Sequence, residues 1–231
     1  MALLGKGLLA IWNGITTETE AEFVRWHIQE HIPERVGLKG FLRGRRYVAE
    51  RGHPKYFNFY ETETAQVLES PEYRARLNAP TPWTQAVVKD FRDTSRTICD
   101  VVTSQGRGEG AWIEAIQIGG VKERDSFAGS VADGLAQDIA RRDGIVGVHF
   151  LKGIDAQANA STAESKLRNQ PDAKCEWILL IEAVELGFLE ALRTNVCSDV
   201  VLCELSPSAT VERGIYRLQY SLAHSELGRT D

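Results

Sequence analysis

The sequence predicts an α+β fold in which two similar units, each with the element order β-α-β-β-α-β, close into one barrel. Short segments recur along the chain: residues 37–40 (GLKG) are echoed by 144–147 (GIVG), and 56–61 (YFNFYE) by 177–182 (WILLIE). The length of 231 residues also suits two domains of about 100 residues each. We therefore expect one domain over residues 1–105 and a second, degenerate domain over residues 110–231.

The elements of the first unit follow from its residue patterns. A run of apolar strand formers predicts a strand over residues 8–15. Capping and acidic residues at 16–20 predict a helix from about Glu18 to Ile32, and Pro33 should end or kink it because proline lacks an N–H donor. The remaining predicted elements are strands over 41–50, 56–62 and 94–104, a helix over 64–77 and a short helix from Trp83.

The second unit begins after a Gly-rich linker at residues 105–110. A helix is predicted over 125–142, because four apolar residues recur at every fourth position and form one face. These residues are Phe127, Val131, Leu135 and Ile139. The other predicted elements are strands over 112–118, 148–154, 177–184 and 210–222 and a helix over 186–195. We expect residues 155–173 to be a mobile excursion and residues 224–231 to be frayed.

Each unit should form a four-stranded antiparallel sheet with both helices on one face, which is the ferredoxin-like arrangement. The opposite face of such a sheet is apolar and must be buried against another layer. The other unit supplies that layer within the same chain. The expected product is an intramolecular α+β barrel, with a cavity between the sheets or at the edge between helix and sheet.

Composition excludes several classes of function. The net charge of −5 gives no general attraction to nucleic acid or to anionic membranes, and no apolar run approaches the ~20 residues of a membrane-spanning helix. The N-terminal segment lacks the charged leader and cleavage site of a signal peptide. The four cysteines show no CxxC spacing, which favours reduced thiols in a cytoplasmic protein over a zinc or redox motif.

The first predicted helix carries the main candidates for chemistry, His27 and His31. On a regular helix they would lie one turn apart on the flank of an apolar stripe made by Ala21, Val24, Ile28 and Ile32, at the rim of the packing against the sheet. A histidine there can act as acid, base or ligand donor, or it can simply be a satisfied edge residue. Residues 27–31 (HIQEH) also match the H-x-x-E-H pattern of zinc peptidases, but no third ligand helix is evident, and we expect no metal. Trp26 should point away from the stripe.

Residues 23–33 (FVRWHIQEHIP), followed by 37–41 (GLKGF) and 45–47 (RRY), resemble the EthD-like members of the dimeric α+β barrel superfamily. The resemblance covers residues 8–104. The second unit matches only through its strand and turn echoes, with Gly134 and Asp138 where histidines would stand. Relatives in this superfamily include lactone isomerases, polyketide cyclases, cofactor-free monooxygenases and haem-binding enzymes. The resemblance implies a mostly apolar pocket for a small cyclic or aromatic molecule, with His31 as a pocket residue and no catalytic cysteine in an equivalent place.

Further side chains near this helix are candidates for holding a ligand. Arg45 and Tyr47 share one face of their strand, where an arginine could clamp a carboxylate or an enolate, or could instead pair with glutamates. The other candidates are Trp12, Asn13, Tyr60, His53 and Trp83. Of these, Tyr60 could donate to a ligand or simply pack, and Trp83 could be a lid or an anchor for the second unit.

These observations favour a small-molecule enzyme that needs no cofactor, of an isomerase, cyclase or dehydratase type. His31, with His27, would act as acid and base, and Arg45 or Tyr47 would hold an enolate-like oxygen. A non-catalytic protein for ligand binding or oligomerisation and a haem-binding protein are the alternatives. A homodimer is an assembly that such a chain could form.

Overall fold

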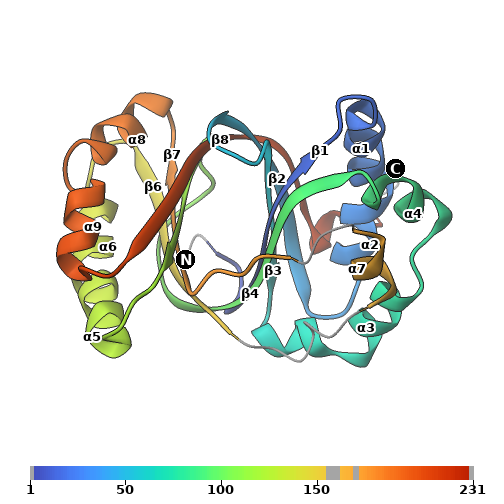
Figure 1. Cartoon of the computed structure of the whole chain (residues 1–231), viewed down its shortest axis with the longest axis horizontal. Helices are drawn as coiled ribbons and strands as arrows, with labels where there is room; N and C mark the ends of the chain where they lie inside the picture. The colour runs from blue at the N-terminus through green and yellow to red at the C-terminus, as the bar shows by residue number, and fades with distance from the viewer. Residues whose placement is uncertain (1–2, 155–161, 169–171, 229–231) are drawn as a thin grey trace.

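The computed structural model describes residues 3–154, 162–168 and 172–228. Eight strands form one closed barrel, and helices cover it on two opposite sides (Figure 1). The strands are β1 (Gly7–Ile15), β2 (Phe41–Arg51), β3 (Tyr56–Thr62), β4 (Phe91–Gly106), β5 (Trp112–Gly119), β6 (Ile145–Gly153), β7 (Trp177–Ala183) and β8 (Thr210–Ala223). In the barrel their order is β1-β3-β2-β8-β5-β7-β6-β4, and every pairing is antiparallel.

The last strand of each half holds the barrel together. We call β1–β4 with their helices the first half, and β5–β8 with theirs the second half. Strand β4 pairs with β1 through one part of its length and with β6 through the other, and β8 bridges β5 and β2 in the same way. These two strands are therefore longer than their predicted spans of 94–104 and 210–222, because they span the seams. Gly106 ends β4 with φ +108, where a Cβ atom would lie 2.0 Å from the Val146 carbonyl oxygen.

The helices lie outside the barrel, those of the first half on one side and those that pack on the second-half sheet on the other (Figure 1). The C-terminal turn at residues 224–226 lies against the first half, where Nδ1 of His224 contacts the Val36 carbonyl oxygen at 2.7 Å. The first half contributes α1 (Glu20–Trp26), η1 (His27–His31), α2 (Ile32–Val36), η2 (Ala65–Glu69), α3 (Pro71–Asn78) and α4 (Pro82–Val88). The second half contributes α5 (Arg124–Gly129), η3 (Ser130–Leu135), α6 (Ala136–Ala140), α8 (Leu186–Arg193), α9 (Asp199–Leu205) and the turn η5 (His224–Glu226). None of the helices in the described part of the chain is long and apolar enough to cross a membrane.

Residues 155–173 were expected to be a mobile excursion, and this expectation was wrong for part of them. The segment Ala163–Leu167 forms helix α7, which packs on the helices of the first half although it belongs to the β6–β7 connection (Figure 1). Arg35 of α2 holds it through an ion pair with Glu164 of 2.6 Å. The expectation for 155–161 and 169–171, and for the tail from 229, lies outside the described residues.

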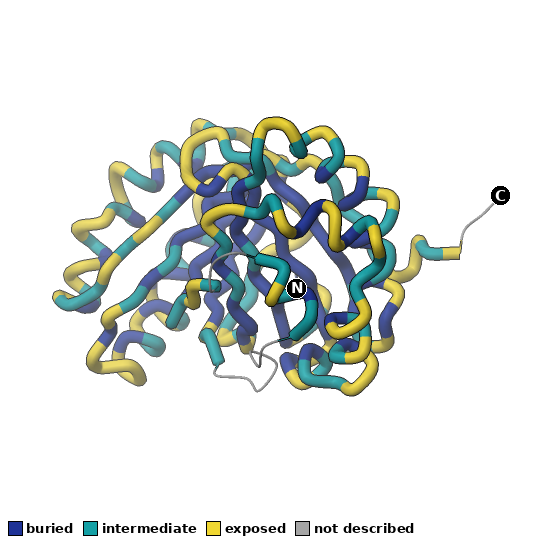
Figure 2. The backbone as a smooth tube through the Cα atoms, turned by 45° about the vertical axis from the view of Figure 1, so that its right-hand side comes forward, coloured by how far each residue is buried: buried dark blue, intermediate teal, exposed yellow. Residues whose placement is uncertain are grey.

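The buried side chains occupy the barrel interior and two layers, each between a sheet and the helices that cover it. The strands are mostly buried, whereas the outer faces of the helices are exposed (Figure 2). We call the space between the first-half helices and sheet the first layer and its second-half counterpart the second layer. The interior is mostly apolar, but one buried ion cluster crosses it: Arg45 contacts Glu61 at 3.0 Å and Glu182 at 2.9 Å, and His149 contacts Glu182 at 3.1 Å. These groups come from both halves, so the cluster ties the two sheets together.

Candidate functional site

The first layer holds a cluster of stacked rings around the two histidines. The His31 ring centroid lies 4.3 Å from that of Trp26 and 5.5 Å from that of His27, and His27 stacks on Phe23 at 5.1 Å. The Tyr60 hydroxyl, from β3, approaches Nε2 of His27 at 3.4 Å. The Nδ1 atoms of His27 and His31 are buried and have no hydrogen-bond partner in the described structure. The cluster therefore holds two buried imidazole nitrogens whose hydrogen-bonding capacity is unused.

Burial keeps both imidazoles neutral. Desolvation lowers the pKa of His27 and His31 well below 6.5, because the charged form loses its hydration. Nearby guanidinium groups push in the same direction, chiefly Arg46 for His27 and Arg35 for His31. With exposures of 4% and 7%, neither histidine is the rim residue that the sequence predicted. They are buried core groups in the neutral form.

The face of the helix that meets the sheet also differs from the prediction. The residues Phe23, Trp26, His27 and His31 are buried, whereas Ala21 of the predicted stripe is exposed. The cause is the π-helical turn η1, in which the Ile32 N–H bonds to the His27 carbonyl five residues back and shifts the phase of the helix. The helix also continues past Pro33 to Val36.

Trp26 therefore points inward, and the expectation that it faces away from the core was wrong. Its indole N–H donates to Glu30 and to Thr84 of α4 at 3.2 Å each. The Glu30 carboxylate also accepts from Thr81 at 2.6 Å, so it is bound to α4 and does not face the histidines. The zinc-peptidase pattern thus lacks its acid, and no group of three metal-binding side chains occurs in the described ranges.

Two arginines stand beside the ring cluster with different partners. Arg35 forms ion pairs of 2.6 Å with both Glu34 and Glu164. Arg46 of β2 is 2% exposed, and its hydrogen bonds go to the neutral Gln219 side chain at 3.2 Å and the Val24 carbonyl at 3.3 Å. No carboxylate pairs with Arg46 among the described residues. Burial lowers the pKa of this guanidinium, which is the cost of a charge without a counter-ion.

The strands add neutral polar groups to the same layer. Asn13 of β1 and Asn58 of β3 are both buried, and the Asn58 amide donates to Oδ1 of Asn13 at 2.8 Å. The Tyr60 side chain points to this face as well. The predicted candidates His27, His31, Asn13 and Tyr60 therefore share one layer.

Arg45, Tyr47 and Trp12 lie on the other side of the sheet, inside the barrel. Arg45 is saturated by Glu61, Glu182 and the Tyr47 hydroxyl at 3.1 Å, so the alternative that it pairs with glutamates is the one observed. Trp12 stacks on Phe57 with centroids 4.5 Å apart. The expected cooperation of His31 with Arg45 or Tyr47 is wrong, because a sheet separates them.

The last two candidates lie at the surface of the molecule. The His53 side chain is 74% exposed and contacts Asp93 at 3.1 Å. It lies in the turn between β2 and β3 and takes no part in the ring cluster. Trp83 was expected to be a lid or an anchor for the second half. Its indole instead donates to Glu22 at 2.7 Å, so it joins α4 to α1 within the first half.

The second layer has the same geometry with different side chains. It too contains a π-helical turn, η3, and its buried helix residues keep the same four-residue spacing. The two halves can be aligned through their strand registers and through the spacing of the buried helix residues. In this alignment seven polar residues of the first layer correspond to apolar residues of the second. The pairs are His27 with Val131, His31 with Leu135, Arg35 with Ile139, Arg46 with Phe150, Asn13 with Ile118, Asn58 with Leu179, and Tyr60 with Ile181. The histidine counterparts are therefore Val131 and Leu135, not Gly134 and Asp138.

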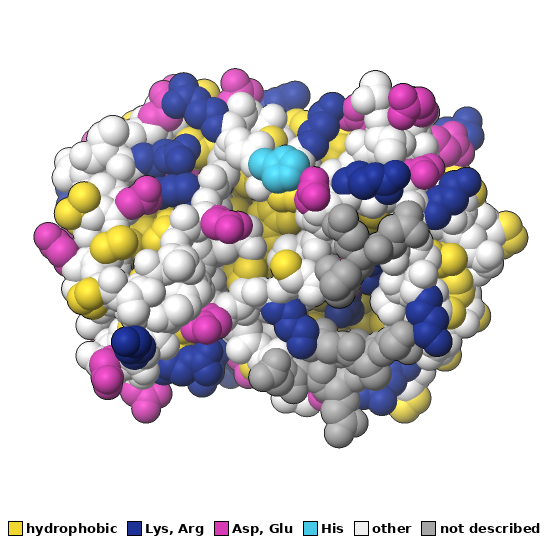
Figure 3. Space-filling view, viewed as in Figure 1, with side chains coloured by type: hydrophobic (Ala, Val, Ile, Leu, Met, Phe, Trp, Pro, Cys, Tyr) yellow, Lys and Arg dark blue, Asp and Glu magenta, His cyan; other side chains and the backbone are white. Residues whose placement is uncertain are grey.

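Arg35, Asn58 and the missing counter-ion of Arg46 were not predicted from the sequence. Alternation along the strand puts Arg46 on the face opposite Arg45, which is a usable signal, but it does not say which face meets the helix. The rings around His31 are in contact, and neither of the two cavities described is lined by a histidine of the first helix, so the described structure shows no preformed space for haem or another ligand at the ring cluster. Both signs of charge are scattered over the face of the molecule seen in Figure 3.

Comparison with solved structures shows the fold. An anthrone oxidase-like protein superposes with a TM-score of 0.67 at 11% identity, covering 97% of this chain and 96% of that one. A protein described as a monooxygenase from Fusobacterium nucleatum gives 0.59 at 10% identity, with 96% of both chains covered, and one described as a chlorite dismutase gives 0.54 at 9%, with 94% and 96% covered. No protein-family model and no curated protein matches the sequence. The chain thus has the ferredoxin-like, dimeric α+β barrel type of fold.

Proposed function

We propose that the first layer binds a small, planar organic anion and that His27 and His31 exchange a proton with it. The reaction type is that of an isomerase, cyclase or dehydratase acting on a cyclic or aromatic compound. The observation that supports this most is the contrast of seven polar side chains in the first layer with seven apolar ones in the second. The second layer also contains a buried Glu114–Arg213 ion pair of 2.7 Å, but at the seven matched positions its apolar side chains suffice for the fold, so the polar residues of the first layer call for another explanation there.

The charge of the ligand follows from Arg46. A buried cation without a counter-ion is costly, and an arriving carboxylate, phenolate or enolate oxygen would remove that cost. Its guanidinium can offer two parallel N–H donors to such an oxygen pair. Arg35 cannot take this role as readily, because two carboxylates already satisfy it.

The proton exchange follows from the neighbouring imidazoles. The positive charge of Arg46 is one of the causes that lower the pKa of His27. A bound anion neutralises that charge and so raises the pKa of His27 toward its usual range, which makes the imidazole a better base once the ligand is in place. His31 stacks beside it with a free Nδ1 atom and can take or return a second proton.

Helix α7 closes this layer in the structure. Its Leu167 packs against the aromatic cluster around Phe23 and Trp26, and its Glu164 pairs with Arg35. We infer that a ligand reaches the histidines when α7 separates from the first-half helices, because both rings are buried beneath this covering.

We further infer that the chain is a duplicated EthD-type unit, with domains over residues 1–105 and 110–231. The support is that both halves have the same order of elements, the same sheet order and a π-helical turn in the first helix. In this view the second half retained the fold and has an apolar layer where the first half has its site. Trp26, which was expected to point away from the apolar stripe, is covered by α4 within the chain, so it is not available to an oligomer contact.

A thermal-shift screen tests the proposed ligand class. The probes are the acids 2-naphthoate and 1-hydroxy-2-naphthoate, with neutral 2-naphthamide as the isostere. We expect the acids to raise Tm by mass action and the amide to have no effect. Arg46→Met should abolish the shift, and Arg217→Met, at an exposed position of β8, should preserve it. Equal shifts with acid and amide, or an unchanged shift in Arg46→Met, would contradict the proposal.

Turnover distinguishes the enzyme from a non-catalytic binding protein. We expect His31→Gln to retain binding of the acid that gives the largest shift while losing its conversion, followed by absorbance and mass spectrometry. Binding without conversion in the unaltered chain would favour the non-catalytic alternative. Mixing with haemin tests the remaining alternative, and we expect no sharp Soret band.

A further inference from the structure

A chain of hydrogen bonds leads from a serine of β4 into the ion cluster of the barrel interior. Oγ of Ser104 lies 2.9 Å from Nδ1 of His149, and Nε2 of His149 lies 3.1 Å from Oε1 of Glu182. The histidine and the glutamate are fully buried, whereas the serine is half-buried. A hydroxyl, an imidazole and a carboxylate in this order can activate a serine as a nucleophile. The two ring nitrogens are used in the reverse of the order found in serine proteases.

A β-bulge brings the hydroxyl to the imidazole. The pairing of β4 with β6 shifts by one residue between Val101 and Thr103, so Val102 has no partner in this register. Val101 packs against the core of the barrel interior, and strict alternation would therefore turn Ser104 to the other face of the sheet. The extra residue reverses the alternation. Ser104 lies directly opposite His149 and shares its face as a result.

The carboxylate fixes which nitrogen of the imidazole carries a hydrogen. Burial alone would raise the pKa of the Glu182 carboxyl group, but Arg45, His149 and the Gly110 N–H together lower it to about 2. Oε2 of Glu182 accepts from Arg45 and from Gly110 at 2.9 Å each, which leaves Oε1 for the histidine. A carboxylate can only accept, so Nε2 of His149 is the donor in this contact. In the neutral imidazole the lone pair is then on Nδ1, where it can accept the Ser104 proton.

The other charged groups of the cluster leave the imidazole as the base. Arg45 pairs with Glu61 of β3 at 3.0 Å, and Arg43 pairs with Glu61 at 2.7 Å and with Glu109 of the β4–β5 connection. The guanidinium groups have no lone pair, and the carboxylates are engaged by them. Among the described residues, the Ser104 hydroxyl is in hydrogen-bond contact with His149 alone.

The first half has a serine at the matching position with a different partner. Ser221 of β8 lies opposite Arg45 of β2, as Ser104 lies opposite His149, and both serines are half-buried. In the alignment of the two halves, Arg45 and His149 take the same place. An arginine cannot accept a proton from a hydroxyl. The two serines therefore differ in whether a base faces them.

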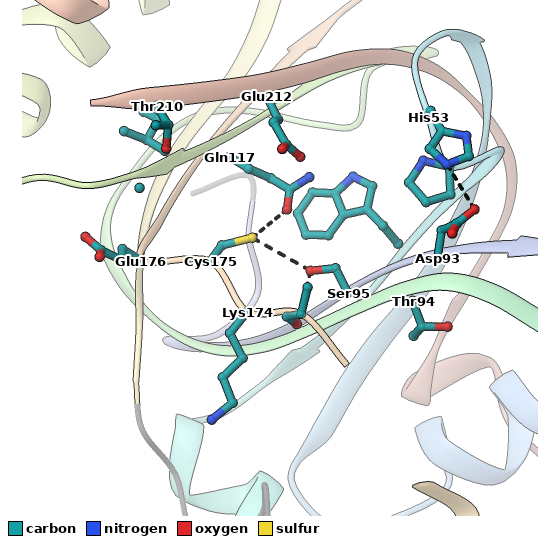
Figure 4. A pocket seen from close by; sticks show the side chains of 15 residues that line it. His53, Asp93, Thr94, Ser95, Gln117, Lys174, Cys175, Glu176, Thr210 and Glu212 are labelled. Atoms are coloured by element: carbon teal, nitrogen blue, oxygen red, sulfur yellow. Dashed lines mark hydrogen bonds and ion pairs between the residues drawn. The ribbon is translucent and has the colours of Figure 1, made fainter. Parts of the chain in front are cut away.

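Ser95 offers a second comparison, because it lines an open cavity of about 500 Å³ (Figure 4). Its hydroxyl donates to the Ala173 carbonyl oxygen at 3.3 Å and lies 3.9 Å from the Cys175 thiol. The imidazole at this cavity, His53, contacts Asp93 instead (Figure 4). Ser95 is therefore a serine at a cavity that has no imidazole as its partner.

We propose that Ser104 is an activated nucleophile that takes the acyl group of a small ester. Its Oγ atom attacks the carbonyl carbon while its proton passes to Nδ1 of His149, and Glu182 stabilises the imidazolium that forms. The bond between the carbonyl carbon and the alcohol oxygen then breaks, and that oxygen takes the proton from Nδ1. Water can hydrolyse the acyl-serine by the same route in reverse. The ester must be small, because the serine is half-buried.

Acetylation by p-nitrophenyl acetate tests this proposal. Release of p-nitrophenolate is followed by absorbance, and the acetyl group is located by mass spectrometry after an acid quench. Ser104 lies in the tryptic peptide 97–107 and Ser221 in the peptide 218–229. We expect Ser104 to be acetylated at least about 100-fold faster than Ser221, since general-base catalysis contributes a factor of this order.

Substitutions assign the roles of the groups. Ser104→Ala and His149→Gln should remove this fast phase of p-nitrophenolate release, and Ser221→Ala and Ser95→Ala should retain it. The pH profile of the unaltered chain gives a test that needs no variant at the buried histidine. We expect the rate at Ser104 to rise with pH and then level off once the imidazole is neutral, whereas a reaction driven by hydroxide keeps rising tenfold per pH unit.

The proposal is overturned by p-nitrophenolate release that is unchanged in Ser104→Ala, by equal acetylation of Ser104 and Ser221, or by a rate at Ser104 that does not level off. The readout is the acetyl group on a residue of the barrel interior, and the histidines of the first layer lie on the other side of the sheet. The result is therefore independent of ligand binding in the first layer.

Discussion

The two layers between helices and sheet have the same backbone design and opposite fillings. The second layer is a continuous aliphatic and aromatic core around Val131, Leu135 and Ile139. The first layer places two histidines and an arginine at the matching positions, among rings and buried amides. The comparison teaches that the fold needs only apolar packing at these positions, so the polar groups of the first layer are the part of the molecule available for chemistry.

The π-helical turn adds a second lesson. Such turns are frequent at functional sites, yet here one occurs in each half, including the half whose first helix places only apolar residues at the matching positions. The turn is therefore a property of how the first helix of each half packs on its sheet. The side chains that it places in the layer decide whether a site results.

The largest expected effect is the introduction of a histidine into the second layer. Leu135→His should lower the free energy of unfolding by about 3–5 kcal/mol, because it removes buried apolar contacts and adds a polar group without partners. Leu135→Met, which conserves volume, should cost less than about 1.5 kcal/mol. Urea denaturation at pH 7 measures both. If Leu135→His were tolerated as well as Leu135→Met, the second layer would not be the rigid apolar core that the comparison requires.

The variants Arg45→Met and Arg46→Met compare a buried arginine that has carboxylate partners with one that has none among the described residues. Arg45→Met leaves Glu61 and Glu182 buried without their partner and should cost about 3–5 kcal/mol. Arg46→Met removes a buried cation that has no carboxylate partner in the described structure, and should be neutral or stabilising. Only the Arg45→Met curve should thus shift to lower urea concentration. Comparable losses in both variants would show that Arg46 is a structural residue like Arg45.

Acid should destabilise the first layer before it affects the carboxylates. The pKa of His27 and His31 lies well below 6.5 in the folded state, so below pH 6.5 the unfolded chain binds more protons than the folded one. Stability is therefore present above pH 6.5 and is lost as the pH falls, by about 1.4 kcal/mol per pH unit for each histidine. Urea denaturation between pH 7 and 5 measures the slope. His31→Leu should reduce the slope of the free energy of unfolding against pH by about half. The control His53→Gln, at an exposed position, should leave the slope unchanged. An unchanged slope in His31→Leu would mean that the histidine is not buried as a neutral group.

The smallest expected effect concerns the cover over the first layer. Glu164→Gln removes one of the two ion pairs of Arg35 and should cost about 1 kcal/mol locally. Hydrogen exchange of the α7 amides should become faster, while that of β7, in the barrel, should remain unchanged. Faster exchange in both would mean that α7 and the barrel open together, which would exclude α7 as a separate cover.

Much of the fold could be predicted from the sequence, since periodicity and turn residues report local structure. The strand at residues 56–62 was predicted with its observed bounds. The apolar stripe predicted for the helix over 125–142, the first helix of the second half, is buried as expected. The direction of Trp26 could not be predicted, because a π-helical turn changes the phase of a helix without a clear sequence signal. Helix α7 was missed because its position depends on a tertiary ion pair between Arg35 and Glu164.

The candidate site was predicted only in part, for a related reason. His27, His31, Asn13 and Tyr60 do share one layer, but Arg45 and Tyr47 were assigned to the same site although they face the barrel. Alternation along a strand gives two faces and does not say which one meets the helix. The arginine that faces the first layer, Arg46, is the neighbour of the one that was chosen.

The central claim is tested most directly by giving the first layer the filling of the second. The double variant His27→Val/His31→Leu copies the residues of the second layer, and its free energy of unfolding and its thermal shift with 2-naphthoate are measured at pH 7. The account predicts unchanged or greater stability, as for polar groups replaced by well-packed apolar ones, together with loss of the thermal shift. A loss of more than about 2 kcal/mol of stability with the shift retained would contradict it, because the histidines would then be part of the core.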